Sequence, residues 1–294
     1  SFLKNHTENI RFYIPDRYTE GYGISEKGIE YAASIDCQLI IALDCGIRAL
    51  NMADLSKKKG IDLIICDHHI PGSILPKAYA VLDPKRKDCR YPFKELSGCG
   101  VGFKLLQGFC LQHTLDLGSL FKYLDLVAVS IASDIVPMVG ENRILAYFGM
   151  QKINSQPLKS LQALIDISGI KAPISISDVV FYIGPRINAA GRLRHAHESV
   201  DLLINEDPVQ LKDFAQRLNE VNKKRQNIDQ TITEEALRTI HEELPDTAKS
   251  TVLFNPKWHK GIVGIVASRC IEHYFRPTII LTESNGVATG SARS

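Results

Sequence analysis

Short apolar runs alternate with helical patterns along the first two thirds of the chain, and this alternation restricts the possible folds more than any other feature. Apolar runs of a few residues bounded by turn residues are typical of buried strands. Strands that alternate with helices of roughly 10 to 15 residues predict βαβ units and a mostly parallel sheet covered on both faces, an α/β fold. We expect strands at 11–14, 38–43, 62–66 and 80–82, and helices at 28–34, 47–59, 100–113, 120–133, 142–154 and 159–168.

The pattern changes after Pro208. Residues 209–243 carry apolar side chains at helical spacing, many charges and no proline or glycine, which predicts one long helix or two joined ones. A strand at 251–254, a helix at 261–274 and a strand at 278–281 then indicate the start of a second α/β domain, with the last residues stopping on a turn. We therefore expect a first domain over 1–200, a connecting helix over 201–247 and an incomplete second domain over 248–294.

The composition excludes several classes of protein. The net charge of the 294 residues is +2, so any basic surface has to come from local clustering. The seven cysteines are odd in number and form no CxxC pair, which favours reduced thiols in a cytoplasmic protein. The sequence shows no secretory leader and no apolar stretch long enough for a bilayer, so we expect no membrane partner. Both ends read as cut, which suggests a fragment of a longer protein.

Two predicted strands end in residues that can hold a metal. "LIIALDCG" contains Asp44, and "LIICDHH" ends in Asp67, His68 and His69. One βαβ unit brings both strand ends to the carboxyl edge of the sheet, where ligands bind in open parallel sheets. A carboxylate and an imidazole without thiolates suit Mn²⁺ or Mg²⁺ better than zinc. The alternative for each aspartate is a cap on the following turn or helix, but two adjacent histidines favour a functional site.

Three further stretches carry candidate polar groups. Asp134 in "VAVSIASDIVPM" would by itself be read as a capping residue at the end of a buried element. "SGCGVGFKL" fits two structures equally well, the start of a helix whose amides bind an anion or a tight turn. In "GPRINAAGRLRHAHES", a Gly/Ala-rich stretch carries Arg186, Asn188, Arg192, Arg194 and two histidines, and guanidiniums on a flexible backbone suit phosphate recognition; Arg194 lies outside the residues that the structure describes below. "WHKGIVGIVASR" predicts a helix whose start could hold a phosphate while Arg269 faces a ligand or an acidic neighbour; the alternative is an ordinary buried helix with one exposed arginine.

Eight motifs in this order resemble the RecJ-type single-strand-specific exonucleases of the DHH phosphoesterase superfamily. They are "YIPDRYTEGYG", "ALDCGI", "CDHHIPG", "LSGCGVGFKL", "ASDIVPM", "GPRINAAGR", "HKGIVGIVASR" and "GSARS". The resemblance implies a catalytic DHH domain, a long connecting helix and a DHH-associated second domain. It also implies 5′ to 3′ hydrolysis of single-stranded DNA in repair or recombination, with two Mn²⁺ or Mg²⁺ ions as cofactors.

The resemblance also implies roles for individual residues. It makes Asp44 the carboxylate that bridges two metal ions, and it makes His68 and Asp134 ligands of one ion. Asp67 would support the site, and His69 would face the scissile phosphate. Positions that match DNA- or 5′-phosphate-binding elements are Arg17, Arg186, Asn188, Arg192, His259, Ser291 and Arg293. The family's Asp-x-Asp-Gly motif is not among these 294 residues, so we expect this polypeptide by itself to be weak or inactive.

Two alternatives remain open at this point. One is a DHH phosphodiesterase of short oligoribonucleotides or cyclic dinucleotides, although such relatives are expected to lack "GPRINAAGR" and the long helix. The other is a non-catalytic single-strand-binding DHH protein, against which the retention of Asp44, His68 and Asp134 argues. For the favoured interpretation we expect single-stranded DNA as the partner and a monomer.

Overall fold

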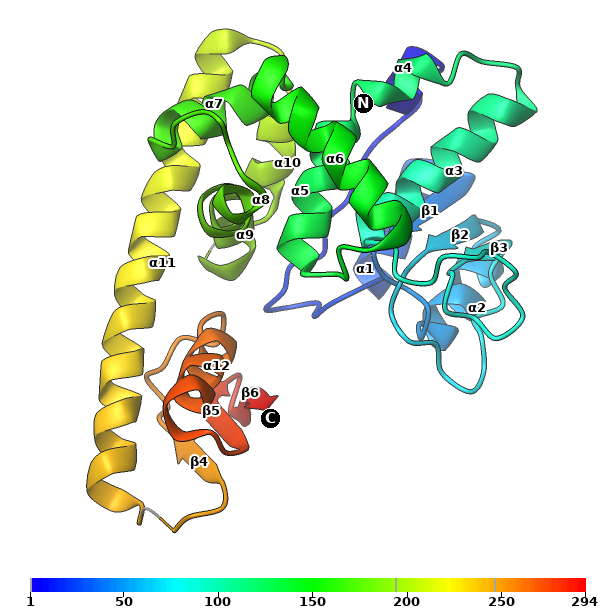
Figure 1. Cartoon of the computed structure of the whole chain (residues 1–294). Coiled ribbons are helices and arrows are strands. Elements are labelled where there is room, and N and C mark those ends of the chain that lie inside the picture. Colours follow the sequence, from blue (N-terminus) through cyan, green and yellow to red (C-terminus); the bar gives the residue numbers. More distant parts are fainter. Residues whose placement is uncertain (1, 194, 246) are drawn as a thin grey trace. The chain divides into compact units, whose positions relative to one another are not determined.

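The computed structural model describes residues 2–193, 195–245 and 247–294, which form two compact units. Unit 1 comprises Ser1–Ile187 and Ser199–Ala215, and unit 2 comprises Asn188–Glu198 and Gln216–Ser294. Helix α11 (Pro208–Glu243) is one continuous helix, as the first of the two sequence alternatives predicts, and it contributes residues to both units (Figure 1). The division of the sequence at 200 and 247 stays a prediction.

Unit 1 contains the predicted parallel sheet. Strands β1 (Leu39–Leu43), β2 (Asp62–Cys66) and β3 (Ala80–Leu82) lie in the order β1-β2-β3, and both strand pairs are parallel. Helix α2 (Leu50–Lys58) connects β1 to β2 and completes a βαβ unit. The α/β fold expected from the alternating pattern is therefore confirmed.

Successive strand residues point to opposite faces of the sheet, and both faces are covered. One face packs Ala42, Leu63 and Ile65 against Ala53 of α2. The other face packs Ile41, Ile64 and Cys66 into a core that includes helices α3 (Gly98–Gln112) and α5 (Leu124–Asp134). Ile65 is fully buried, and burial of such a side chain stabilises the fold by roughly 1.5–3 kcal/mol. This two-sided packing fixes the strand ends that carry the candidate metal ligands.

The other helices before α11 belong mainly to unit 1, and the last two of them reach into the part of unit 2 that covers residues 188–198. They are η1 (Phe2–Asn5), α1 (Glu26–Ser34), α4 (Gly118–Phe121), α6 (Gly140–Ser155), α7 (Lys159–Ser168), α8 (Ile176–Asp178), the π-helical segment η2 (Val179–Ile183), α9 (Gly184–Leu193) and α10 (His197–Ile204). The expected single helix over 120–133 is divided between α4 and α5. Leu120 and Val127 are nevertheless buried in the same core, so the apolar periodicity continues across the break and conceals it in the sequence.

The expected strand over 11–14 is wrong. Tyr13 instead packs its ring on Tyr31 of α1 with ring centroids 5.4 Å apart, and its hydroxyl donates a hydrogen bond to Glu20 Oε2 at 2.8 Å. Pro15 follows directly and offers no backbone N–H to a strand partner. Tyr13 therefore contacts a helix surface rather than a neighbouring strand.

The "GPRINAAGR" segment is helical and not the flexible backbone that its composition suggests. It forms α9, and Ala189 and Ala190 within it are fully buried. Alanine is the best helix former, and its small side chain lets a helix pack closely against its neighbours. The Gly/Ala-rich composition therefore reflects close packing.

Unit 2 has its own three-stranded sheet. Strands β4 (Thr251–Phe254), β5 (Thr278–Ser284) and β6 (Val287–Arg293) lie in the order β4-β5-β6, with helix α12 (Val263–Tyr274) between β4 and β5 in sequence. β4 is parallel to β5, and β6 is antiparallel to it. The expectation that the chain stops on a turn is therefore wrong. Asn285 and Gly286, with φ values of 55° and 74°, form the Asn-Gly hairpin turn whose signal in the sequence the prediction overlooked.

The described part of the chain contains no helix that combines the length and the apolar character needed to cross a membrane. The longest helix, α11, carries charged and polar side chains along its length.

A half-buried carboxylate on α11 ties this helix to the segment that follows β4. Glu235 accepts hydrogen bonds from Trp258 Nε1 at 2.8 Å and from Asn255 Nδ2 at 3.0 Å. We expect Glu235→Ala to lower the free energy of unfolding of unit 2 by about 1–3 kcal/mol, because it leaves two donors without an acceptor. Trp258 is the single tryptophan, so its fluorescence during urea unfolding reports on this unit. Glu242→Ala, which removes an exposed carboxylate from the same helix, is the control, and equal stabilities of the two variants would contradict the prediction.

Candidate metal centre and nucleic-acid interface

The register of the first sheet places two aspartates side by side. Leu43 pairs with Cys66 at the carboxyl ends of β1 and β2, so the next residues, Asp44 and Asp67, leave the sheet together. The Asp44 amide donates a hydrogen bond to the Cys66 carbonyl at 2.8 Å, and the Asp67 amide donates to the Leu82 carbonyl at 2.9 Å. The structure thus confirms that both strand ends share one edge of the sheet.

A third aspartate at this edge was not predicted. Asp83 follows β3 and is 3% exposed, and its Oδ1 accepts a hydrogen bond from the Lys85 amide at 2.8 Å. Burial raises the pKa of Asp83, and the nearby charge of Asp67 adds to this shift. The sequence signal was available, because "VLDP" repeats the pattern of a strand followed directly by an aspartate.

Asp44 has an unusual backbone conformation. Its φ of 63° lies in the left-handed region, which is uncommon for residues other than glycine, and its side chain is 52% exposed. Gly46 follows with a φ of 110°, and a Cβ there would lie 2.8 Å from Ile24 Cδ1. Backbone strain of this kind is often found at functional sites. This tight turn directs the Asp44 carboxylate toward His68.

His68 is held in a single orientation by its two ring nitrogens. Nδ1 lies 3.0 Å from the Leu96 carbonyl oxygen, and Nε2 lies 3.1 Å from Asp44 Oδ1. A carbonyl oxygen only accepts hydrogen bonds, so Nδ1 carries a hydrogen and donates it. A hydrogen bond with Asp44 raises the pKa of His68 against the opposing effect of burial. The ring is thereby fixed in the way that metal-ligating histidines are fixed in proteins, with Nε2 directed at the site.

Asp67 is a buried acceptor that organises the DHH triplet. Its Oδ2 accepts from the Ile47 amide at 2.9 Å, and its Oδ1 accepts from the His68 amide at 2.8 Å, the His69 amide at 3.2 Å and His69 Nδ1 at 2.7 Å. Burial would raise the pKa of Asp67, but these hydrogen bonds outweigh it and lower the pKa. Because Nδ1 of His69 donates to Asp67, the Nε2 atom of this 60% exposed side chain is directed away from the core.

Three side chains come together as a possible cation site. One ligand atom from each of Asp44, His68 and His69 lies within 4.8 Å of the others. Asp134, the last residue of α5, is not part of this group of described residues. Burial raises the pKa of Asp134, the Asp44 carboxylate adds to the shift, and the charge of His68 opposes it. The structure thus places Asp134 close enough to interact electrostatically with Asp44 and His68, but it groups His69, rather than Asp134, with these two residues.

The neighbouring thiols do not provide thiolate ligands. Burial raises the pKa of Cys45 to about 11 and that of Cys66 to about 12. Both thiols therefore stay protonated near neutral pH, whereas zinc sites that use cysteine require the thiolate. The remaining carboxylate and imidazole groups suit Mn²⁺ or Mg²⁺.

The residues predicted to contact nucleic acid divide between the two units. Arg17 and Arg186 lie in unit 1, whereas the other five, Asn188, Arg192, His259, Ser291 and Arg293, lie in unit 2. The Arg17 guanidinium is 4.3 Å from the centroid of the Tyr22 ring, and Arg186 Nη1 donates to the Tyr182 carbonyl at 2.7 Å. Asn188 is exposed on α9.

Four of the five unit 2 residues lie around the loop that leads into α12. Arg192 Nη1 donates to the Gly261 carbonyl at 3.2 Å, and His259 Nδ1 accepts from the Gly261 amide at 3.1 Å. Burial lowers the pKa of His259, and the charge of Lys224 lowers it further. A Cβ on Gly264 would lie 3.3 Å from Ser291 Oγ and 3.6 Å from Arg293 Nη2, so both side chains lie beside the first turn of α12.

Arg269, at the end of the "WHKGIVGIVASR" motif that contains His259, faces an acidic neighbour. Its Nη2 donates to Asp229 Oδ2 at 2.9 Å, and Asp229 is 1% exposed on α11. Burial lowers the pKa of Arg225, and both Arg192 and Arg269 lie close enough to lower it further while Asp229 opposes them. The sequence did not indicate this cluster because its members lie on separate segments.

Comparison with known proteins agrees with this geometry. Residues 1–131 match the family described as "DHH family, N-terminal domain". The chain is 39% identical over 297 residues to the single-stranded-DNA-specific exonuclease RecJ of Bacillus subtilis (strain 168), covering 99% of this chain and 37% of that protein. It is 35% identical over 303 residues to the RecJ of Escherichia coli (strain K12), covering 97% and 52%. A crystal structure of exonuclease RecJ bound to manganese superposes with a TM-score of 0.81 at 31% identity, covering 92% of this chain and 67% of that chain.

The chain belongs to the RecJ family. The resemblance carried by the eight motifs is therefore confirmed, as is the mixed α/β fold with a parallel sheet. The chain spans 37% and 52% of the two curated RecJ proteins, about half of their length or less. The roles assigned to individual residues stay predictions.

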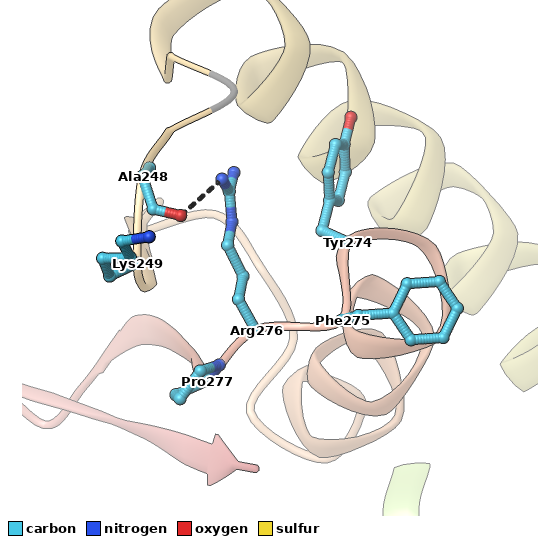
Figure 2. Close-up of a pocket in the computed structure, with 6 residues that line it drawn as sticks. All are labelled: Ala248, Lys249, Tyr274, Phe275, Arg276 and Pro277. Carbon is cyan, nitrogen blue, oxygen red and sulfur yellow. Dashed lines mark hydrogen bonds between the residues drawn. The ribbon is translucent and has the colours of Figure 1, made fainter.

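This RecJ-family chain also has a pocket away from the predicted ligands. It is lined by Ala248, Lys249, Tyr274, Phe275, Arg276 and Pro277 (Figure 2). Arg276 is 9% exposed and donates to Thr251 Oγ1 at 2.9 Å and to the Ala248 carbonyl at 3.1 Å. Its guanidinium also lies 5.1 Å from the centroid of the Tyr274 ring. These contacts are internal, so Arg276 serves to hold the loop before β4 against the end of α12.

Proposed function

We propose that this RecJ-family protein is a metal-dependent exonuclease that hydrolyses phosphodiester bonds of single-stranded DNA from the 5′ end. The observation that carries the proposal is the grouping of ligand atoms from Asp44, His68 and His69 within 4.8 Å at the carboxyl edge of the parallel sheet. The RecJ proteins of B. subtilis and E. coli, both named single-stranded-DNA-specific exonucleases, support the substrate class.

We propose Mn²⁺ or Mg²⁺ as the cofactor. Asp44 and His68 are the ligands, with Asp134 as a further ligand of the same ion. The hydrogen bond from His68 Nδ1 to the Leu96 carbonyl supports this assignment, because it leaves Nε2 for the cation. The similar RecJ structure is bound to manganese. Bound divalent cations would activate a water molecule for attack on phosphorus and neutralise charge on the leaving oxygen.

His69 has the exposure and the support to contact the scissile phosphate. Its side chain is 60% exposed, and the ionised Asp67 carboxylate accepts from its Nδ1 at 2.7 Å. This hydrogen bond orients the ring so that Nε2 is the ring nitrogen left to meet a phosphate oxygen. Asp67 thus orients the ring without contacting the substrate, since it is 1% exposed.

The remaining predicted residues would hold the DNA strand. Arg17, Arg186 and Arg192 supply guanidiniums, whose planar donor sets match phosphate oxygens. Ser291 and Arg293 provide a hydroxyl and a guanidinium beside the first turn of α12, which suits a terminal 5′-phosphate. Asn188 and His259 are further candidates for backbone contacts. We propose that the protein acts in DNA repair or recombination, in the cytoplasm and as a monomer.

The function is tested with the full-length protein and single-stranded DNA labelled at either end. We expect Mn²⁺-dependent release of nucleotides that begins at the 5′ end and stops when EDTA removes the metal. A dinucleotide substrate serves as the comparison. Cleavage of the dinucleotide alone would favour the short-oligonucleotide phosphodiesterase, and strand binding without any cleavage would favour a non-catalytic binding protein.

Arg293 offers a test of the proposed DNA contacts. We expect Arg293→Ala to weaken single-stranded DNA binding about 5- to 30-fold at low salt and to make the dependence of log Kd on log salt shallower by nearly one unit, because a phosphate contact releases counterions. Fluorescence anisotropy over a salt series measures both quantities. Arg238→Ala, which removes an exposed arginine from α11 of the same unit, is the control. Identical salt slopes for the wild type and Arg293→Ala would remove Arg293 from the interface.

A further inference from the structure

We propose that Gly98 is a positioning residue of the metal centre, because the absence of its side chain makes room for the Asp44 carboxylate. This inference rests on the proposed function and adds a residue to it. A Cβ built on Gly98 would lie 2.1 Å from Asp44 Oδ1, 2.4 Å from Asp44 Cγ and 2.7 Å from Asp44 Cβ. Non-bonded heavy atoms are most stable about 3.5–4.0 Å apart, so any side chain at position 98 displaces Asp44.

Neither backbone can move away easily. Gly98 is buried at the first position of α3, where the Ser97 side chain caps the helix by accepting from the Gly100 amide at 3.2 Å. Leu96 and Val101, on either side of this start, are 1% and 2% exposed. Asp44 is held by the hydrogen bond from its amide to the Cys66 carbonyl. Rotation of the Asp44 side chain can relieve the contacts with Oδ1 and Cγ, whereas the contact with Cβ requires a shift of the tight turn at Asp44 as well. Both changes move the Asp44 carboxylate away from its position 3.1 Å from His68 Nε2.

The backbone conformation at position 98 does not require glycine. Its φ lies outside the positive range that favours glycine, so alanine fits the same backbone conformation. Alanine is also the better helix former by about 1 kcal/mol at an interior position. Backbone and helix preference alone therefore predict that Gly98→Ala is neutral or stabilising, whereas the contact with Asp44 predicts a loss at the metal centre.

The test compares Gly98→Ala with Gly108→Ala in the full-length protein. Gly108 lies on the same helix, and a Cβ there would have no atom within 4 Å. We expect Gly98→Ala to weaken Mn²⁺ binding at least tenfold, measured by the electron paramagnetic resonance signal of free Mn²⁺. We also expect kcat on single-stranded DNA to fall roughly 100-fold with little change in KM. Gly108→Ala should match the wild type in all three quantities.

A second comparison keeps the inference testable if Gly98→Ala is unstable. In an Asp44→Gly background the clashing atoms are gone, and the positive φ at position 44 suits glycine. Any loss of thermal stability caused by Gly98→Ala should therefore disappear in this background, which is the signature of direct coupling in a double-mutant cycle. Circular dichroism confirms that each variant is folded.

The outcomes separate the inference from the proposed function. A full-length wild type that neither binds Mn²⁺ nor cuts DNA would contradict the proposed function, while the coupling between positions 98 and 44 still decides the steric claim. A wild type that binds Mn²⁺, together with a Gly98→Ala variant of equal Mn²⁺ affinity, would overturn the positioning role of Gly98. A stability loss that persists undiminished in the Asp44→Gly background would overturn it as well.

Discussion

His68→Ala in the full-length protein is expected to lower the turnover of single-stranded DNA by at least 100-fold while leaving strand binding nearly unchanged. His68 Nε2 lies 3.1 Å from Asp44 Oδ1, and the Leu96 carbonyl fixes the ring in this orientation. Loss of a hydrogen-bond partner behind a metal ligand typically costs 10- to 100-fold in metal affinity or activity, so loss of the ligand itself should cost at least as much. Strand binding depends mainly on phosphate contacts made by other residues.

Single-turnover cleavage and anisotropy titrations measure these two effects separately. His241→Ala is the control, because His241 is an exposed histidine on α11. Mn²⁺ titration adds a readout that does not depend on catalysis, and we expect its midpoint to rise for His68→Ala alone. Unchanged turnover and unchanged Mn²⁺ affinity would remove His68 from the metal centre.

Asp67→Asn is expected to lower the free energy of unfolding by about 2–3 kcal/mol. Both carboxylate oxygens of Asp67 accept hydrogen bonds, Oδ2 from the Ile47 amide and Oδ1 from three donors of His68 and His69. An asparagine has one oxygen and one NH₂ group in place of the two oxygens. Either the Ile47 amide or the donors of His68 and His69 would therefore face an NH₂ group, which cannot accept their hydrogen bonds. Hydrogen bonds to charged groups contribute about 1.5–3 kcal/mol, and an unsatisfied buried donor carries a further penalty.

The same substitution should lower turnover at least tenfold, because the His69 ring loses the carboxylate that orients it. Urea unfolding and steady-state cleavage are the two measurements. Asp62→Asn is the matched control, since Asp62 begins the same strand, β2, and is exposed. A destabilisation below about 0.5 kcal/mol, within the range of ordinary surface substitutions, would contradict the proposed role of Asp67.

The sequence predicted the elements whose signal is local. The apolar runs that became β1 and β2 were recognisable because a buried strand needs several consecutive apolar residues. The long helix α11 was recognisable from helical spacing without proline or glycine. The placement of Asp44 and Asp67 at one edge also followed from the sequence, since parallel strands joined by a helix must end on the same side.

The errors occurred where the same composition fits two structures. Residues 11–14 have the apolar and aromatic composition of a strand, yet Tyr13 packs on a helix, because pairing in a sheet depends on an available neighbouring strand. "GPRINAAGR" has the composition of a flexible loop, yet it forms α9 with Ala189 and Ala190 buried. In both cases the surroundings decided the structure, and a single sequence does not contain them.

The types of residues at the candidate site, and the sheet edge at which β1 and β2 place them, follow from the order of residues along the chain. Which atoms of these residues face one another depends on how distant segments pack. His68 is oriented by the carbonyl of Leu96, 28 residues away, and Asp44 keeps its position because Gly98 has no side chain. The physical reason is that strand periodicity acts over neighbouring residues, whereas hydrogen-bond direction and steric exclusion act only between atoms that the folded chain has already brought within a few ångströms.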